Sequence, residues 1–255
     1  QSLSIKKDSL NNYIANRLSA SGKIGFGVNV YDLLGKELNK NGIYSLEMKI
    51  NGIRHYYHDV ETFSFSESKF INLLIDYEYY SKYKSRIQKT FREKENKLSI
   101  YKGLIEEGGI TINEGLNYQV EIIAKDFIGN SSSLKIPVVG LKSESILNQE
   151  RDTTAYKIVK KEFQKFSKNG VTIAFPKNTF YKDLFLNFSV NDRIATIHKP
   201  IIPLDKKFTI TFDSIMYKKS EVNHIYIANM NNKKYPYYMD TRKKSDKLFE
   251  LKHMY

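Results

Sequence analysis

Apolar and polar residues alternate along most of the chain in a pattern that predicts β-strands. Ile24, Phe26, Val28 and Val30 are separated by small or polar residues, which is the period of a half-buried strand. The same alternation recurs in the ranges 44–50, 118–124, 134–138, 171–175, 184–188 and 208–212. Short strands of this kind at regular spacing are typical of a β-sandwich.

Turn residues separate several of these strands. Asn51-Gly52 directly follows one alternating stretch and predicts a two-residue hairpin, because both residues tolerate a positive φ. The segment Asp126-Phe-Ile-Gly-Asn130 predicts a second hairpin, since Asp and Asn cap their own backbone and Gly supplies a positive φ. The chain is therefore expected to be mainly β.

One stretch has helical spacing instead. Phe70, Leu73, Leu74 and Tyr77 recur every three or four residues, and Ser66 is a suitable N-cap. A helix over about 67–79 is predicted. The following residues, 81–97, are dense in Lys, Arg and Glu, and we expect an exposed extension of the helix or a long excursion.

These patterns predict two domains, in line with a length of 255 residues. Residues 1–140 are expected to form an immunoglobulin-like β-sandwich with a helical excursion at about 67–90. Residues 141–154 are polar and poor in aromatics, as a linker is. Residues 155–255 are expected to form a second β-sandwich. Because the chain begins at Gln1 and ends abruptly at Tyr255, we expect it to be part of a longer protein.

The formal net charge of +13 has two interpretations. It can mark an anionic partner such as a wall polymer or lipid headgroups, or it can reflect a general bias towards Lys and Asn. Nucleic acid is not the expected partner, because the basic residues are spread along the chain and Lys outnumbers Arg. The sequence has no cysteine, which excludes disulfides and Cys-based metal sites, and no stretch long enough for a transmembrane helix.

His55, His58 and Asp59 are the candidate metal ligands. A zinc site needs side chains that converge on one point. In a strand, however, side chains alternate between the two faces, so His55 and His58 are expected to point in opposite directions. The alternative is a surface strand of mixed polar and aromatic residues. No catalytic motif is recognised elsewhere, and the chain itself is expected to be neither an enzyme nor a holder of a cofactor.

A candidate binding surface follows the predicted helix, where aromatic and basic residues are interleaved. Its members are Tyr79, Tyr80, Tyr83, Lys82, Lys84 and Arg86. Rings of this kind can stack on bases or sugars while the cations hold an anionic backbone. The alternative is that part of the stripe is core, because Tyr77 and Tyr80 would share a helical face with Phe70 and Leu73.

Several segments resemble the region that follows the peptidase domain in lysostaphin-type (LytM-like) zinc metallopeptidases of Gram-negative bacteria. The matching runs are GKIGFGVNVYD (22–32), NKNGIYSLE (39–47), FSFSE (63–67), FINLLIDY (70–77), RIQK (86–89), KDFIGN (125–130), FPKNTF (175–180) and PLDK (203–206).

This resemblance implies a parent protein that cuts peptidoglycan in the cell envelope, in the periplasm or at the outer membrane. The family holds zinc through HxxxD and HxH motifs, and neither motif occurs here, so no catalytic residue is carried over. The catalytic domain and its zinc would lie upstream, and this chain would be a non-catalytic accessory region. Its partners would be its own peptidase domain and possibly peptidoglycan or envelope proteins. The alternative is a stand-alone envelope adhesion or assembly protein that uses its immunoglobulin-like domains to bind proteins or glycans.

Overall fold

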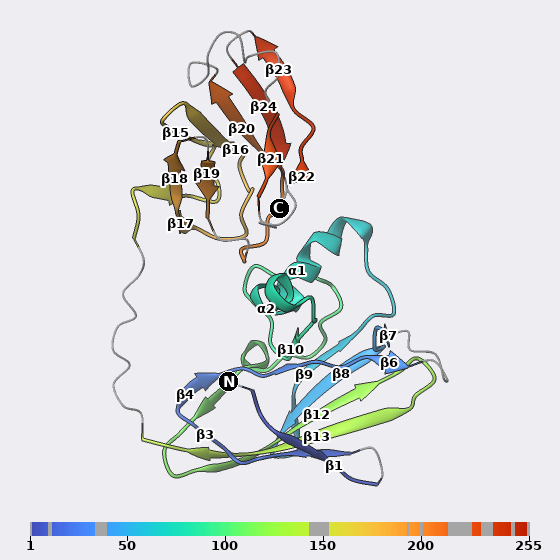
Figure 1. Ribbon diagram of the computed structural model, residues 1–255. Coiled ribbons are helices and arrows are strands. Elements are labelled where there is room, and N and C mark those ends of the chain that lie inside the picture. The colour runs from blue at the N-terminus through green and yellow to red at the C-terminus, as the bar shows by residue number, and fades with distance from the viewer. Residues whose placement is uncertain are drawn as a thin grey trace. The chain divides into compact units, whose positions relative to one another are not determined.

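The computed structural model of the chain is mainly β and divides into two compact units, Gln1–Gln149 and Glu150–Tyr255 (Figure 1). It describes residues 2–9, 12–33, 40–142, 153–192, 194–198, 201–213, 226–230, 237–245 and 248–253. The expected linker at 141–154 lies outside these ranges except for two residues at each end, and each unit is described separately.

The main sheet of unit 1 has seven strands in the order β1-β2-β13-β12-β8-β9, with β3 also paired to β13. The strands are β1 (Ile5–Lys7), β2 (Tyr13–Ala15), β3 (Leu18–Ala20), β8 (Ser45–Ile50), β9 (Ile53–Asp59), β12 (Asn117–Lys125) and β13 (Ser131–Gly140). The pairs are antiparallel except that β2 and β3 run parallel to β13.

Both predicted hairpins are confirmed. Asn51 and Gly52 have φ values of 49° and 85° between β8 and β9, so the turn uses the positive φ for which these residues are suited. Residues 126–130 join β12 to β13, and Gly129 has a φ of 101°. Local sequence therefore determines how the centre of this sheet is paired.

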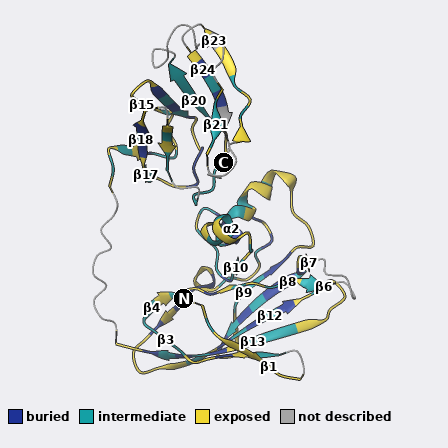
Figure 2. Cartoon of the chain, viewed as in Figure 1, coloured by how far each residue is buried: buried dark blue, intermediate teal, exposed yellow. Residues whose placement is uncertain are grey.

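A second, smaller layer covers one face of the main sheet. It contains the pairs β4 (Gly22–Ile24) with β11 (Ile110–Ile112) and β5 (Gly27–Val28) with β10 (Gln88–Lys89), so the predicted strand at 24–30 is broken in two. Phe26 and Ile110 from this layer pack with Leu46, Met48 and Val120 from the sheet, and the last three are fully buried. Figure 2 shows this buried layer along β8 and β12. A pair β6 (Asp32–Leu33) with β7 (Lys40–Asn41) completes the unit's strands among the described residues.

The predicted helix at 67–79 is present only in pieces. A 3₁₀ helix η1 (Phe65–Phe70) leads into α1 (Ile71–Leu74), and α2 (Tyr77–Tyr83) follows separately. Ile75 interrupts them with an extended backbone (φ −101°, ψ 161°), because it forms a β-bridge with Gln88. The single helical stripe expected from the spacing is therefore divided between two helices.

The segment after α2 is not an exposed extension of the helix, one of the two forms expected from its charge; α2 ends at Tyr83, and a long, partly buried excursion follows. Thr90 and Asn96 are buried, as are Leu98 and Ile100. Thr90 donates its hydroxyl to the carbonyl of Phe26 at 3.1 Å, and Leu98 packs with Ile100 and Leu74. A short 3₁₀ turn, η2 (Glu106–Gly108), ends the segment. These buried residues hold the charged segment against the rest of unit 1.

Unit 2 is built around a five-stranded sheet in the order β15-β16-β20-β24-β23. These strands are β15 (Gln164–Lys168), β16 (Val171–Phe175), β20 (Phe208–Asp213), β24 (Leu248–His253) and β23 (Arg242–Ser245). Shorter pairs join β14 (Tyr156–Ile158) to β17 (Leu184–Leu186), β18 (Phe188–Asn191) to β19 (Ile194–Ile197), and β21 (Ala228–Asn229) to β22 (Tyr237–Tyr238). The core contains Ile173, Phe175, Leu186 and Phe208, as the alternation predicts. No helix in the described ranges is long and apolar enough to cross a membrane.

Candidate binding surface on helix α2

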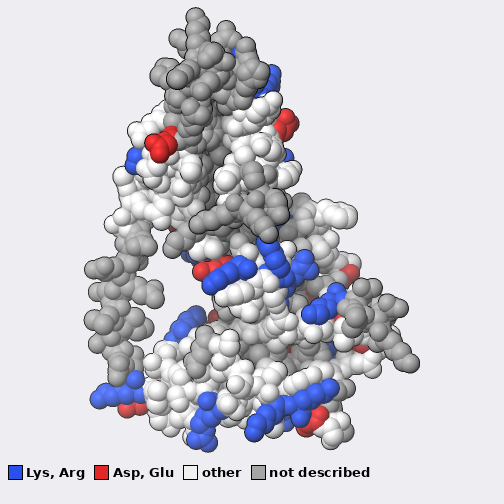
Figure 3. All heavy atoms as spheres, in the orientation of Figure 1, with Lys and Arg blue, Asp and Glu red and all other residues white. Residues whose placement is uncertain are grey.

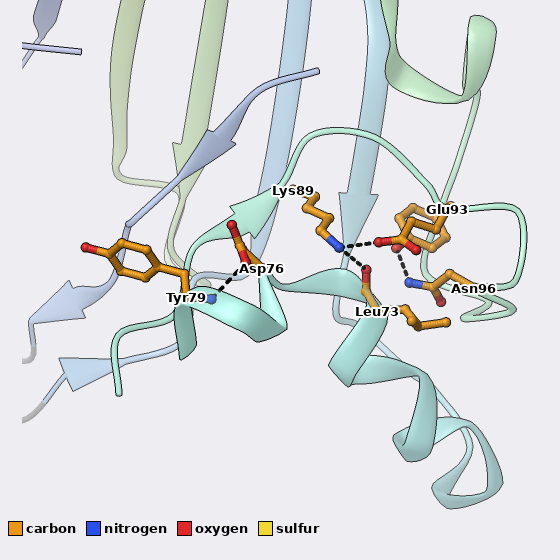
Figure 4. A network of polar contacts seen from close by, with 7 residues as sticks. Leu73, Asp76, Tyr79, Lys89, Glu93 and Asn96 are labelled. Atoms are coloured by element: carbon orange, nitrogen blue, oxygen red, sulfur yellow. Dashed lines mark hydrogen bonds and ion pairs between the residues drawn. The ribbon is translucent and has the colours of Figure 1, made fainter. Parts of the chain in front are cut away.

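Helix α2 is held in shape at both ends by local hydrogen bonds. The Asp76 carboxylate accepts a hydrogen bond from the backbone N–H of Tyr79 at 2.9 Å, which caps the first turn (Figure 4). At the other end Lys84 adopts a left-handed conformation (φ 56°), and its N–H donates to the carbonyl of Tyr80. A seven-residue helix is marginal by itself, so these caps matter for its order.

The helix is also fastened to the strand that follows it. The N–H of Asp76 donates to the carbonyl of Ile87 at 2.8 Å. The Lys89 ammonium donates to the carbonyl of Leu73 at 3.5 Å and pairs with Glu93, and its side chain is only 16% exposed (Figure 4). Since Lys89 belongs to β10, these contacts hold α1 and α2 against the second layer of unit 1.

The structure places the six residues predicted as a binding surface in two groups, on α2 and just after it. The rings of Tyr79 and Tyr83 lie 4.6 Å apart at 43°. The Lys82 ammonium lies 5.0 Å from the Tyr83 ring centre, and both Lys84 and Arg86 lie 5.6 Å from the Tyr80 ring centre. We call this set the α2 surface: Tyr79, Tyr80, Tyr83, Lys82, Lys84 and Arg86.

The α2 surface is partly open to solvent: Lys82, Tyr83 and Lys84 are exposed, whereas Tyr79 and Tyr80 are half-buried. Tyr77 and Tyr80, which the alternative places in the core, are thus half-buried and not fully buried. No residue of α2 is buried, and Tyr83 is 55% exposed (Figure 2). The pKa of Lys82 is raised, first because of its hydrogen bond with Tyr83. Elsewhere on the face drawn in Figure 3, Lys and Arg lie at several separate places. The α2 surface is therefore distinguished by its aromatic rings more than by charge alone.

Rings next to cations give this surface a defined chemistry. Tyrosine offers a flat apolar face and a hydroxyl, so it can stack on a sugar ring and hydrogen-bond to its substituents. Lys and Arg beside the rings can pair with carboxylates or phosphates. Each cation already makes a cation–π contact with a tyrosine ring of the chain, so part of its capacity to bind an anionic ligand is used within the protein. These groups can therefore contact anionic substituents and flat rings of a ligand.

The three candidate metal ligands have different surroundings, and His58 belongs to the core. His58 is buried and its Nδ1 lies 2.8 Å from the Tyr56 hydroxyl, while the rings of Tyr56 and Tyr101 meet its ring edge to face. Burial lowers the pKa of His58 to about 4, and the nearby Asp59 only partly opposes this shift. Burial likewise raises the pKa of Tyr56 and of Tyr101. His58 is thus a neutral member of an aromatic core.

Asp59 and His55 have other surroundings. Asp59 accepts hydrogen bonds from Lys102 at 2.6 and 2.8 Å, and this pair is the first cause of the lowered pKa of Asp59. His55 occupies a bulge, because Met48 pairs with Tyr56 and Lys49 with Arg54, which leaves His55 without a cross-strand partner. No three His, Asp or Glu residues in the described part of the chain are placed to hold a metal ion.

The interpretation of residues 55–59 as a surface strand is therefore wrong. Tyr56 and His58 both point into the core, with exposed fractions of 0% and 1%. The partner that covers them, Tyr101, is more than forty residues away in the sequence, and Asn96 donates to its hydroxyl at 2.7 Å. The period-two alternation of Tyr56 and His58 was the only local signal for this cluster.

Comparison with known proteins informs unit 2 alone. No curated protein and no solved structure is found to match the chain. Neither result connects the chain with LytM-like metallopeptidases. Residues 155–245 match the family profile described as a Zu5-like domain, so this part of unit 2 is similar to Zu5-like domains.

Proposed function

We propose that this chain is a non-catalytic accessory region of a cell-envelope peptidoglycan metallopeptidase, and that it holds wall polymer through the α2 surface. Its two units would act as immunoglobulin-like β-sandwiches, and the zinc and the catalytic domain would belong to another part of the parent protein. The observation that carries the proposal is the two groups on and beside the capped, partly exposed helix α2, in which three tyrosine rings lie next to three cations.

Peptidoglycan suits this surface chemically. Its glycan strands supply rings for stacking, and its stem peptides supply carboxylates for Lys82, Lys84 and Arg86. Such contacts are individually weak, because exposed ion pairs contribute about 0–1 kcal/mol each. A sacculus carries many equivalent sites, so the local concentration of sites is high and a chain that dissociates from one site can rebind at another. A positioning module benefits from weak contacts, since the attached enzyme must move along its substrate.

The test is co-sedimentation of the full chain with purified peptidoglycan sacculi, scored together with release of soluble fragments. We expect binding without release, and weaker binding after Tyr80→Ala, which removes the ring that both Lys84 and Arg86 contact. Tyr118→Ala is the matched control, a partly buried tyrosine on β12 in unit 1. Equal binding by both variants would remove the α2 surface from the proposal, and chelator-sensitive release would show that the chain is itself an enzyme.

A stand-alone adhesion or assembly protein is the second candidate. Strand β1 ends the order of the main sheet in unit 1, and all three of its residues are exposed. An edge strand of this kind can accept a further strand from a partner. In that case the chain would bind an envelope protein without any peptidase domain, and Lys6→Pro in β1 would abolish the binding while leaving sacculus binding intact.

A further inference from the structure

The turn Asn51-Gly52 between β8 and β9 carries reactive groups as well as a favourable backbone shape. In an Asn-Gly dipeptide the backbone nitrogen of Gly can attack the side-chain amide of Asn, because Gly has no side chain that shields this nitrogen. The sequence contains the dipeptide three times, at 41–42, 51–52 and 169–170. Ile, Ile and Val follow, so the next residue does not separate the three sites. The fold therefore decides which of them reacts.

At Asn51 the amide is held by its oxygen, and its nitrogen is open. The side-chain Oδ1 of Asn51 accepts a hydrogen bond from the N–H of Gln119, on the neighbouring strand β12, at 2.8 Å. Negative charge develops on this oxygen when a nucleophile adds to Cγ, and a donor that is already in place stabilises it. Asn51 and Gly52 are both exposed, and no described residue is hydrogen-bonded to Nδ2 of Asn51 or to the N–H of Gly52.

The other two Asn-Gly sites are hindered, one by hydrogen bonds and one by burial. Nδ2 of Asn169 donates to the carbonyl of Val190 at 3.2 Å. The carbonyl of Gly170 accepts from the N–H of Asp213 at 2.8 Å. Nδ2 is the leaving group of the reaction, so its hydrogen bond must break before ammonia departs. Nδ2 of Asn41 is buried without a hydrogen-bond partner among the described residues, and burial shields it from the water that the reaction needs.

We propose that Asn51 is a site of spontaneous deamidation in the folded protein. The backbone nitrogen of Gly52 attacks Cγ of Asn51, so a bond from this nitrogen to Cγ forms and the bond from Cγ to Nδ2 breaks. The proton of the Gly52 amide passes through solvent to the departing nitrogen, which leaves as ammonia. Water then opens the cyclic imide at either carbonyl, and the product is aspartate or isoaspartate at position 51. The reaction consumes water alone and needs no enzyme.

The two products have different effects on the hairpin. Aspartate at position 51 keeps an acceptor for the N–H of Gln119 and adds a negative charge at an exposed position. Isoaspartate routes the backbone through the side chain and so lengthens a two-residue turn by a carbon atom. Turn length fixes the register of a hairpin, and here β8 and β9 pair directly from Ile50 and Ile53 outward. Isoaspartate at this position is therefore expected to weaken the β8–β9 pairing of unit 1.

The test is peptide mapping of the full chain after incubation at mildly alkaline pH. Trypsin places the three dipeptides in separate peptides, 41–49, 50–54 and 169–177. Mass spectrometry follows the replacement of the amide NH₂ by OH in each peptide, and electron-transfer fragmentation distinguishes isoaspartate from aspartate. We expect the reaction at Asn51 to be about fivefold faster than at Asn169, which is the ratio that one neutral hydrogen bond corresponds to. Isoaspartate should be among the products at Asn51.

The control is the same chain unfolded in guanidinium chloride, which removes the hydrogen bonds and the burial but keeps the sequence. The three sites should then react at similar rates. The proposal would be overturned by a folded chain in which Asn51 does not react, or in which Asn41 or Asn169 reacts as fast as Asn51. A product at Asn51 that contains aspartate but no isoaspartate would also overturn it, because opening of the cyclic imide gives both.

Discussion

Acidification is expected to destabilise unit 1 through His58. The side chain is 1% exposed, and burial lowers its pKa from 6.5 to about 4. An imidazole in the unfolded chain takes up a proton near its ordinary pKa, but the folded protein resists protonation until the pH is close to 4. The folded state is therefore favoured fully above about pH 6.5, and this advantage is lost as the pH falls through the window between the two values.

The magnitude follows from the two pKa values. Their difference corresponds to about 3 kcal/mol of unfolding free energy over the whole window, of which about 2 kcal/mol is lost by about pH 5. Three carboxylates of unit 1 add little to the loss in the upper part of this range. Asp59, Glu107 and Asp126 have pKa values below their ordinary values, so their contributions persist to lower pH. Since domains of this size are stable by only about 5–15 kcal/mol, the effect is large enough to measure.

The assay is urea unfolding at a series of pH values between about pH 7.5 and pH 5. The chain is compared with His58→Gln, and His55→Gln is the matched control on the same strand. Each unit can give its own urea unfolding transition; the one whose midpoint changes in His58→Gln is assigned to unit 1, because His58 lies in that unit. We expect the natural chain and the control to lose stability across the window and His58→Gln to lose much less. An equally steep loss in His58→Gln would refute the assignment of this pH dependence to His58.

Three further predictions concern individual positions. Gly108→Ala should destabilise unit 1 by about 2 kcal/mol or more. Gly108 has a φ of 83°, and an added Cβ would lie 2.4 Å from the Thr90 carbonyl oxygen. In urea unfolding, the control Gly115→Ala should have a smaller effect, because Gly115 has a φ of 74° but no atom within 4 Å of the added Cβ. Ile173→Ala should destabilise unit 2 by about 2–5 kcal/mol, because Ile173 is fully buried in its core. Hydrogen exchange should show lost protection in unit 2 alone; lost protection in unit 1 as well would contradict the division into two units. Asp76→Ala should remove about 1 kcal/mol of capping from α2 and weaken sacculus binding, whereas unchanged binding would show that helix order is not needed.

The sequence by itself determined those features that depend on neighbouring residues. Alternation and the Asn51-Gly52 turn sufficed for the β8–β9 hairpin, since the side-chain period and the positive φ are local properties. The placement of the six residues of the α2 surface on one short helix and just after it also followed from sequence, because they lie within eight positions. The mainly β character of both units followed from the same alternation.

Tertiary structure decided the rest, because the deciding partners are distant in the chain. Ile75 is extended and divides the predicted helix only because Gln88 is placed to bridge with it. His58 is buried because Tyr101 and the anchored segment before it cover that face of β9, and no local pattern records this cover. The sequence shows that Phe127 and Ile128 lie in a turn, but only the folded hairpin shows that they project into solvent, since exposure depends on every segment that packs nearby.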